Sequence, residues 1–292
     1  MTDLPILCAG SALWDIVART DHAMKPGFDV PGRVGRQMGG VALNVALALA
    51  RRKIPVELLS MIGRDENGVH LIAQAAAEGV GCAHVSRTAM TDAYLVIEGP
   101  GGDVFGAVAD CATLESGGDT ALAPLTDGRL AAADRPWTGT LVVDGNFAEP
   151  VLDALPDRPE LALASLALVP ASPGKAARMA RAMRHPHATI YVNRTEAQIL
   201  CRRAFDDAAA AARGLADLGA SAVVVTDGGA ASAALADTLV TARPPQVTAR
   251  STTGAGDAFL AVHLEALTKG AAAAEALAAA NAAAAAHIAR HD

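Results

Sequence analysis

A glycine-rich turn near the carboxyl end of the chain could bind an anion and accept a proton. The run Thr252-Thr253-Gly254-Ala255-Gly256-Asp257-Ala258-Phe259 leads directly into an amphipathic helix pattern. Residues without bulky side chains let backbone N–H groups converge on an anion at a helix N-terminus, where the helix dipole also favours negative charge. Asp257, in the first turn, could take a proton from an attacking hydroxyl group. The alternative is an Asp that only caps the helix.

A second glycine motif lies near the amino end of the chain. The run Gly39-Gly40-Val41-Ala42-Leu43-Asn44 starts another helix pattern. Paired glycines let a ligand approach the backbone closely, and Asn44 lies about one turn into the helix, where its amide could bond a hydroxyl group. Taken alone, this motif predicts a helix start and little more.

Alternating strand and helix patterns position these two motifs. Short apolar runs predict strands at 6–9, 56–62, 141–144, 163–169, 189–192 and 222–226. Helical patterns follow at 42–52, 68–78, 174–183, 196–201, 208–218 and 256–267. Strands that alternate with helices predict a mostly parallel sheet covered on both faces.

Two segments interrupt this alternation. Residues 15–39 contain short extended pieces separated by Pro and Gly, and residues 94–97 and 104–108 flank a turn at 99–103 that is typical of a hairpin. Together they predict a small β-sheet placed over the carboxyl ends of the parallel strands, where ligands of open α/β folds bind.

Composition excludes several functional classes. The chain has 292 residues, of which 52% are hydrophobic and 19% charged, so it is predicted to be globular. Its net charge of −7 offers no basic surface for nucleic acid. The four scattered cysteines favour a reducing compartment over a disulfide framework or a zinc site. The N-terminus lacks the basic region of a signal peptide, and charged and polar residues interrupt the alanine-rich segment 271–289, so we expect a cytoplasmic protein without a membrane span.

In combination, the two glycine motifs resemble the signature regions of the ribokinase/PfkB family of carbohydrate kinases. Three further motifs resemble the family in the same order along the chain: Gly10-Ser11 with Asp15, Asn193-Arg194-Thr195-Glu196, and Thr226-Asp227-Gly228. The resemblance extends over nearly the whole chain. It implies a ribokinase-like three-layer α/β/α sandwich with a mostly parallel central sheet, whose body comprises 1–14, 37–90 and 112–292 and whose small β lid comprises 15–36 and 91–111.

The resemblance also implies ATP-dependent phosphoryl transfer to a sugar hydroxyl group. Asp257 would be the general base, and the amides of Gly254, Ala255 and Gly256 would stabilise charge on the transferred group. The remaining site residues fall into three sets. The acceptor would be bound by Asp15, Gly39, Gly40, Asn44, Tyr94 and Asn146. Magnesium would be organised by Asn193 and Glu196, with Glu196 acting through water. The nucleotide would also meet Thr226, Gly228, Asn281 and Lys175.

Several of these residues have an ordinary structural alternative. Tyr94 also suits the packed face of a hairpin, and Asn146 also suits a turn with Gly145. Lys175 is more often solvated at such a helix start. Asn281, in an alanine run, could be only a packed or exposed helix residue.

Within the family, the chain is most similar to pseudouridine kinases, by residues 94–103, 107–110, 142–146 and 169–176. This resemblance implies that the acceptor is the 5′-hydroxyl of pseudouridine. Another sugar or nucleoside kinase, acting on ribose, fructose or adenosine, is the nearest alternative. A noncatalytic nucleoside sensor is the alternative of a different class. An open lid sheet has edges that a second copy could cover, so we expect a homodimer joined through the lids.

Two departures from the family pattern concern ions and phosphate. Ser251 stands where the family usually has an Asp of the monovalent-cation loop, so potassium activation is doubtful. Arg194 replaces a frequently acidic residue, and its guanidinium could pair with a nucleotide phosphate.

Overall fold

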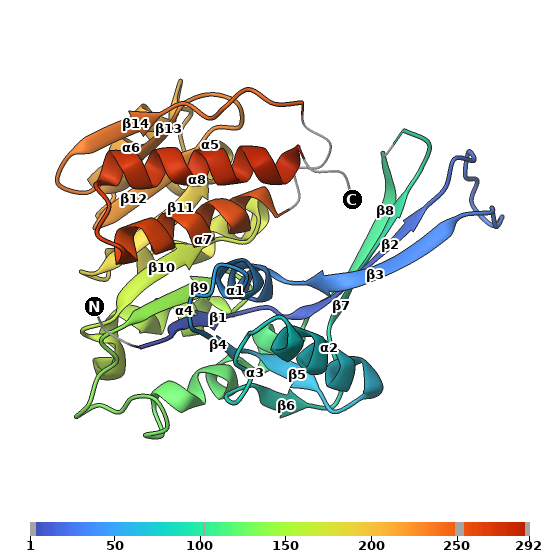
Figure 1. Ribbon diagram of the computed structural model, residues 1–292, viewed down its shortest axis with the longest axis horizontal. Helices are drawn as coiled ribbons and strands as arrows, with labels where there is room; N and C mark the ends of the chain where they lie inside the picture. Colours follow the sequence, from blue (N-terminus) through green and yellow to red (C-terminus); the bar gives the residue numbers. More distant parts are fainter. Residues whose placement is uncertain (1–3, 102, 249–253, 290–292) are drawn as a thin grey trace.

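The central feature of the structure is an eight-stranded sheet. The computed structural model describes residues 4–101, 103–248 and 254–289. The strands lie in the order β14-β13-β12-β11-β10-β9-β1-β4 (Figure 1). From β4 to β12 they are parallel, whereas β13 and β14 are antiparallel. Their bounds are β1 Ile6–Ala9, β4 Val56–Leu59, β9 Thr140–Asp144, β10 Ser165–Val169, β11 Ala188–Asn193, β12 Ala222–Thr226, β13 Ser232–Leu235 and β14 Leu239–Ala242.

Helices cover both faces of this sheet, as the ribokinase-like prediction requires. One face carries α1 Val41–Ala50, α7 Ala255–Thr268 and α8 Ala273–Ile288, and α2 Glu66–Ala77 adds to the same core. The other carries α3 Thr113–Leu122, α4 Glu149–Ala154, α5 Arg194–Cys201 and α6 Ala208–Asp217. The three-layer sandwich is therefore confirmed.

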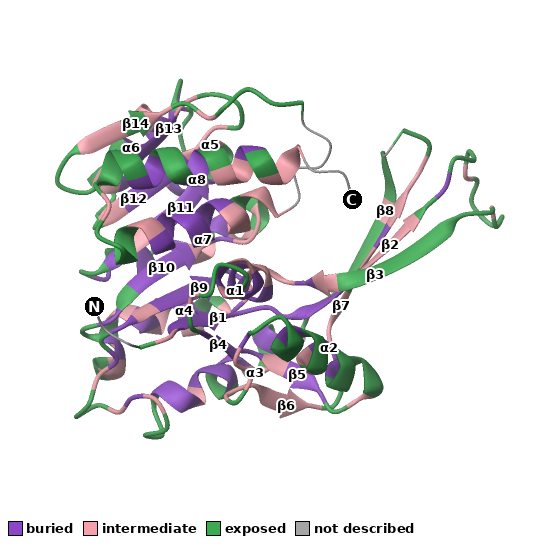
Figure 2. Cartoon of the chain, viewed as in Figure 1, coloured by how far each residue is buried: buried purple, intermediate pink, exposed green. Residues whose placement is uncertain are grey.

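Strand side chains divide between two apolar cores. In β1, Ile6 and Cys8 join the core beneath α1 and α7, while Leu7 and Ala9 join the core on the α4–α6 side. Alternate residues of a strand point to opposite faces, so a strand covered on both faces is apolar throughout. Figure 2 shows this continuous burial along the central strands.

A four-stranded sheet protrudes from the body beside the carboxyl ends of the parallel strands (Figure 1). It comprises β2 Leu13–Arg19, β3 Arg33–Gly39, β7 Ala93–Glu98 and β8 Val104–Asp110, in the order β3-β2-β7-β8. The predicted hairpin is β7 paired antiparallel with β8, although Gly102 in its turn lies outside the described residues. Much of this sheet is exposed (Figure 2).

Two element predictions need correction. The predicted helix 174–183 is instead two short 3₁₀ segments, Pro173–Met179 and Ala182–Arg184. Tertiary contacts override helical periodicity here, since Arg178 bonds the Phe147 carbonyl and Arg181 bonds the Asp153 carbonyl. The predicted strand 56–62 is divided at Ser60, whose buried hydroxyl donates to the Gly10 carbonyl. After this point β5 Met61–Gly63 pairs with β6 Ser86–Thr88 in a separate sheet.

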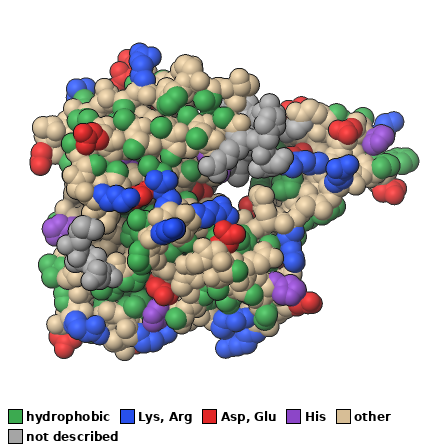
Figure 3. Space-filling model, in the orientation of Figure 1, with side chains coloured by type: hydrophobic (Ala, Val, Ile, Leu, Met, Phe, Trp, Pro, Cys, Tyr) green, Lys and Arg blue, Asp and Glu red, His purple; other side chains and the backbone are tan. Residues whose placement is uncertain are grey.

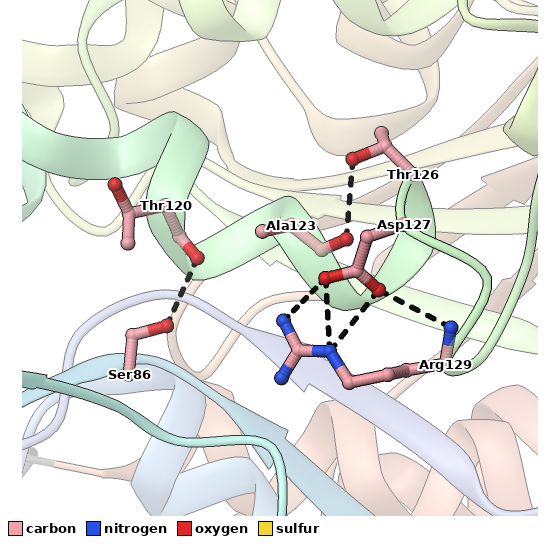
Figure 4. Close-up of polar contacts among 6 residues, drawn as sticks. All are labelled: Ser86, Thr120, Ala123, Thr126, Asp127 and Arg129. Atoms are coloured by element: carbon pink, nitrogen blue, oxygen red, sulfur yellow. Dashed lines mark hydrogen bonds and ion pairs between the residues drawn. The ribbon is translucent and has the colours of Figure 1, made fainter.

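The sequence pattern does not predict helix α3, because Gly117 and Gly118 reduce its helix propensity. A side chain at Gly118 would overlap the Phe147 ring, at 2.7 Å from its Cβ position, so the glycine permits close packing. The end of the helix is bound to β6 by the Ser86 hydroxyl, which donates to the Thr120 carbonyl (Figure 4). In the turn that follows, Arg129 bonds the Asp127 carboxylate through its guanidinium and its backbone N–H.

Surface charge is mixed on the face shown in Figure 3, where Lys and Arg side chains are interspersed with Asp and Glu. Within the described part of the chain, no helix combines the length and apolar character that crossing a membrane requires.

Replacing Gly40 tests the turn that starts α1. Gly40 has φ +94°, and a Cβ there would lie 2.5 Å from the Ser11 carbonyl oxygen. We expect Gly40→Ala to lower the free energy of unfolding by about 1–3 kcal/mol, because backbone strain and a backbone clash coincide. Urea unfolding measures this change. Gly229→Ala is the matched control, since no atom lies within 4 Å of its Cβ position and its loss should be under about 0.5 kcal/mol.

Candidate active site

A pocket lies where β11, β12 and the start of α7 meet. Asn193 and Thr226, the last residues of β11 and β12, are register partners and both line it. Gly256 and Asp257 line it from α7, and Glu196 lines it from α5. The cavity measures about 170 Å³. The structure thus brings together five residues that the sequence assigned to catalysis, magnesium and nucleotide.

Asp257 connects this pocket to the amino-terminal glycine motif. Its Oδ2 accepts a 3.0 Å hydrogen bond from the side-chain amide of Asn44, on the neighbouring helix α1. Burial raises the pKa of Asp257 to about 7, and the negative charges of Asp144 and Asp15 act in the same direction, whereas the Asn44 bond lowers it. A carboxyl group with a pKa near neutrality can accept and return a proton.

The turn before Asp257 has the conformation that the sequence predicted. Gly254 is the N-cap of α7 with φ +76°, and as a glycine it has no side chain with which to cap the helix. Ala255 and Gly256 form the first turn, so the amides of all three residues lie at the helix N-terminus, where the helix dipole favours anions. Thr252, Thr253 and Ser251 lie outside the described residues.

Of the residues expected to bind the acceptor, Asn44 is bonded to Asp257, and Asp15 lies close enough for its charge to raise the pKa of Asp257. A Cβ added to Gly39 would lie 2.3 Å from a carboxylate oxygen of Asp15, so the glycine leaves space for that side chain. Burial raises the pKa of Asp15. Tyr94 of β7 is the register partner of Asp15 in β2, which places the two side chains on the same face of the protruding sheet.

Asp144 organises this region, although the sequence analysis gave it no role. Its carboxylate is fully buried at the end of β9 and accepts bonds from the Ser11 hydroxyl and from the backbone N–H groups of Ser11, Ala42 and Asn146. Gly10 has no side chain to clash with it, since a Cβ there would lie 2.2 Å away. An Asp at the carboxyl end of an apolar strand, followed by Gly-Asn, is the signal that could have identified it.

Lys175 lies near Asp144 and is not a lining residue of the pocket of Asn193 and Thr226. Its ammonium group donates a 2.6 Å hydrogen bond to Asn146 Oδ1. The amide nitrogen of Asn146 donates in turn to the Ser11 hydroxyl at 2.9 Å. Both residues are therefore linked to Asp144, and the contact of Lys175 with the nucleotide stays a prediction.

Asn281 packs inside the protein, and its contact with the nucleotide stays a prediction. Its side chain is buried and donates to the Ser232 hydroxyl at 2.7 Å and to the Ala242 carbonyl at 3.1 Å, which fixes α8 to β13 and β14. It is not a lining residue of the described pocket, so its packed-helix alternative fits the structure. Gly228, with φ +56°, lies in the exposed turn after β12, next to the lining residue Thr226.

Asn193 and Glu196 form a reciprocal capping box at the start of α5. The Asn193 side chain accepts from the Glu196 backbone N–H, and the Glu196 carboxylate accepts from the Asn193 backbone N–H, both at 2.9 Å. Burial raises the pKa of Glu196. Across the described ranges no three His, Cys, Asp or Glu side chains gather closely enough to hold a metal ion by themselves. One buried carboxylate fits magnesium that keeps mainly water and phosphate oxygens as ligands.

Comparison with known proteins agrees with this geometry. The family model described as "pfkB family carbohydrate kinase" matches residues 4–292. This chain belongs to the pfkB family. Such membership implies a phosphotransferase with an alcohol group as acceptor.

Individual relatives are similar over different extents. The structure of a carbohydrate kinase from Agrobacterium tumefaciens is 26% identical, with a TM-score of 0.79 over 96% of this chain and 89% of that one. Arabidopsis thaliana ribokinase complexed with ribose and ATP is 20% identical, with a TM-score of 0.79 over 99% and 93%, a likeness of fold. An ATP-dependent ribose-1-phosphate kinase from Halopiger xanaduensis is 33% identical over 102 residues, which span 33% of this chain and only about a third (34%) of that relative.

The pKa of Asp257 predicts the pH dependence of turnover. Because a general base must be ionised, kcat/KM should rise about tenfold per pH unit below about pH 7 and level off above it. Asn44→Ala removes the hydrogen bond that lowers this pKa, so the rising limb should move to higher pH. Pre-steady-state or steady-state rates across pH 5–9 measure the limb. Asn146→Ala is the control, because the Asn146 side chain bonds Ser11 and Lys175 and not Asp257, so the pH at which kcat/KM levels off should not change. An unchanged pH in Asn44→Ala would contradict the role of Asp257 as the base.

Proposed function

We propose that this pfkB-family chain is an ATP-dependent kinase that phosphorylates the 5′-hydroxyl of pseudouridine to give pseudouridine 5′-phosphate. The observation that carries the kinase proposal is the position of Asp257. It lines the pocket of Asn193 and Thr226, and it is hydrogen-bonded to Asn44 beside the Gly39-Gly40 turn. One carboxylate is therefore shared by the two regions assigned to nucleotide and acceptor.

The reaction needs one proton acceptor and a stabilised anion. The Asp257 carboxylate takes the proton of the acceptor hydroxyl group. The oxygen of that hydroxyl group forms a bond to the γ-phosphorus of ATP, and the bond from that phosphorus to the ADP oxygen breaks. The amides of Gly254, Ala255 and Gly256 donate to the transferred group from the start of α7. When bound, magnesium supplies charge neutralisation to the phosphates, with Glu196 and Asn193 as the residues that would organise its water ligands. Potassium activation stays doubtful, because the family's Asp is replaced at Ser251.

The pseudouridine assignment rests on sequence resemblance in the hairpin and after β9 and β10. The structure supports a polar acceptor site there, since Asn146 and Lys175 form a hydrogen-bonded pair next to Asp144. An ammonium group can donate to a base carbonyl, and it can equally bind a sugar phosphate. The partial similarity to a ribose-1-phosphate kinase makes that sugar phosphate the necessary comparison. Ribose, fructose and adenosine remain the alternatives from the sequence.

We also propose that the four-stranded sheet is a lid that excludes water from the acceptor, and that it joins two copies in a homodimer. Its outer strands β3 and β8 leave backbone groups unpaired at both edges. Exposed apolar side chains of these strands include Val34, Val104, Phe105 and Val108. A second copy would cover them.

The four free cysteines support the expected cytoplasmic location.

An acceptor panel tests the proposed reaction. ADP formation from ATP and magnesium is measured with pseudouridine, uridine, ribose, fructose, adenosine and ribose 1-phosphate. We expect kcat/KM for pseudouridine to exceed that for every other acceptor by at least about tenfold, or roughly 1.4 kcal/mol. Preferential turnover of ribose 1-phosphate or free ribose contradicts the pseudouridine assignment and keeps the kinase. Absence of turnover with every acceptor contradicts the kinase itself.

The lid dimer predicts a concentration-dependent mass. Sedimentation velocity should show a dimer whose dissociation is promoted by Val108→Lys, because a charge replaces an exposed apolar side chain in the middle of β8. Leu163→Lys, at an exposed position just before the amino end of β10 and so at the opposite end of the parallel strands from the protruding sheet, should leave the mass unchanged. A monomer at every concentration contradicts the dimer.

A further inference from the structure

An ion pair connects the two segments that line the nucleotide side of the pocket. Arg194 Nε lies 2.8 Å from Asp227 Oδ1, and the Arg194 side chain is about one-third exposed (36%) while that of Asp227 is 17% exposed. Arg194 is the first residue of α5, and Asp227 is the first residue after β12. The sequence suggested a phosphate as the partner of Arg194, but in the structure its partner is Asp227.

Each member of the pair directly follows a lining residue. Asn193 precedes Arg194 and Thr226 precedes Asp227, and these two lining residues are register partners. The ion pair therefore connects β11 and β12 one residue beyond their last register pair, which is Asn193 and Thr226. It connects the Asn193–Glu196 capping box to the turn that contains Gly228.

The guanidinium is anchored away from Asp257. Its Nη1 donates to the Phe205 carbonyl at 2.9 Å, and Phe205 belongs to the core on the α5–α6 side of the sheet. Asp257 and its helix lie over the opposite face, where Tyr191, Val224, Phe259 and Leu260 line the pocket. The rim of the pocket is formed by the ends of β11 and β12 and the turns that follow them. Arg194 contacts this rim from the face of the sheet opposite to Asp257.

The turn after Asp227 has little packing of its own. Gly228 and Gly229 are exposed, and no atom lies within 4 Å of either Cβ position. Inside the turn, the Ala230 N–H donates to the Asp227 carbonyl at 2.9 Å. The Asp227 carboxylate therefore supplies the side-chain connection between this turn and α5.

We propose that Arg194 and Asp227 are a positioning pair for the nucleotide: their ion pair fixes the turn at Thr226–Gly229 relative to the Asn193–Glu196 box, so that ATP binds a preformed rim. This inference rests on the proposed function, which assigns ATP to these strand ends. A positioned rim lowers the cost of ordering a loop when ligand binds. The pair should affect ATP and not the acceptor, whose residues lie around Asp144 and Asp15.

Steady-state kinetics with separate variation of ATP and acceptor tests the pair. Arg194→Gln and Asp227→Asn should each raise KM for ATP roughly three- to fivefold, the upper part of the range of a partly exposed ion pair, and leave KM for the acceptor within about twofold. The double variant should be no worse than either single variant, because both remove the same interaction. Arg194→Lys should recover part of the loss. ATP affinity measured by calorimetry should follow the same order.

Arg181→Gln is the matched control. Arg181 forms an exposed 2.6 Å ion pair with Asp157, remote from the pocket lining, so its KM for ATP should equal that of the parent chain. Equal rises of both KM values, additive losses in the double variant, or unchanged ATP affinity would each overturn the positioning pair. Failure of the parent chain to bind or use ATP would instead reject the proposed function on which the pair depends.

Discussion

The hydrogen bond from Asn44 to Asp257 joins residues that are 213 positions apart in the chain. It is possible because α1 and α7 pack side by side on one face of the sheet, each preceded by a glycine with positive φ. Gly40 turns the chain from the protruding sheet into α1, and Gly254 begins α7. The two regions that we propose to bind acceptor and nucleotide therefore meet at one carboxylate, whose position depends on how these two helices pack.

Three carboxyl groups lie close together in this site, and their mutual repulsion affects the pKa of Asp257. Asp15, Asp144 and Asp257 lie close enough for the charges of the first two to raise the pKa of the third. Asp144 is stabilised by backbone and hydroxyl donors, so it can remain buried and fix the surrounding turns. Asp257 has an amide donor from Asn44, and burial raises its pKa to about 7. The site thus contains one carboxylate at a strand end, Asp144, that suits organisation, and another in the first turn of α7, Asp257, that suits proton transfer.

Periodicity predicted the sheet and the helices on both faces, whereas only the family resemblance implied that Asp257, Asn44, Asn193, Glu196 and Thr226 belong to one site. Neither settles the features that tertiary contacts decide. The 3₁₀ segments at 173–184 follow from arginine bonds to distant carbonyls, and the burial of Asn281 follows from its contacts with β13 and β14. Lys175 and Asp144 could not be placed for the same reason, since their partners, Asn146 and Ser11, become neighbours only when the strands are ordered in the sheet.

Single-turnover kinetics of Asp257→Asn, with nucleoside and ATP binding measured in parallel, tests the central claim most directly. An Asn retains an oxygen that can accept from Asn44 but cannot serve as the base. We expect phosphoryl transfer to fall by roughly 10²- to 10⁴-fold while both ligands still bind. A rate within about twofold of the parent chain would contradict the role of this carboxylate.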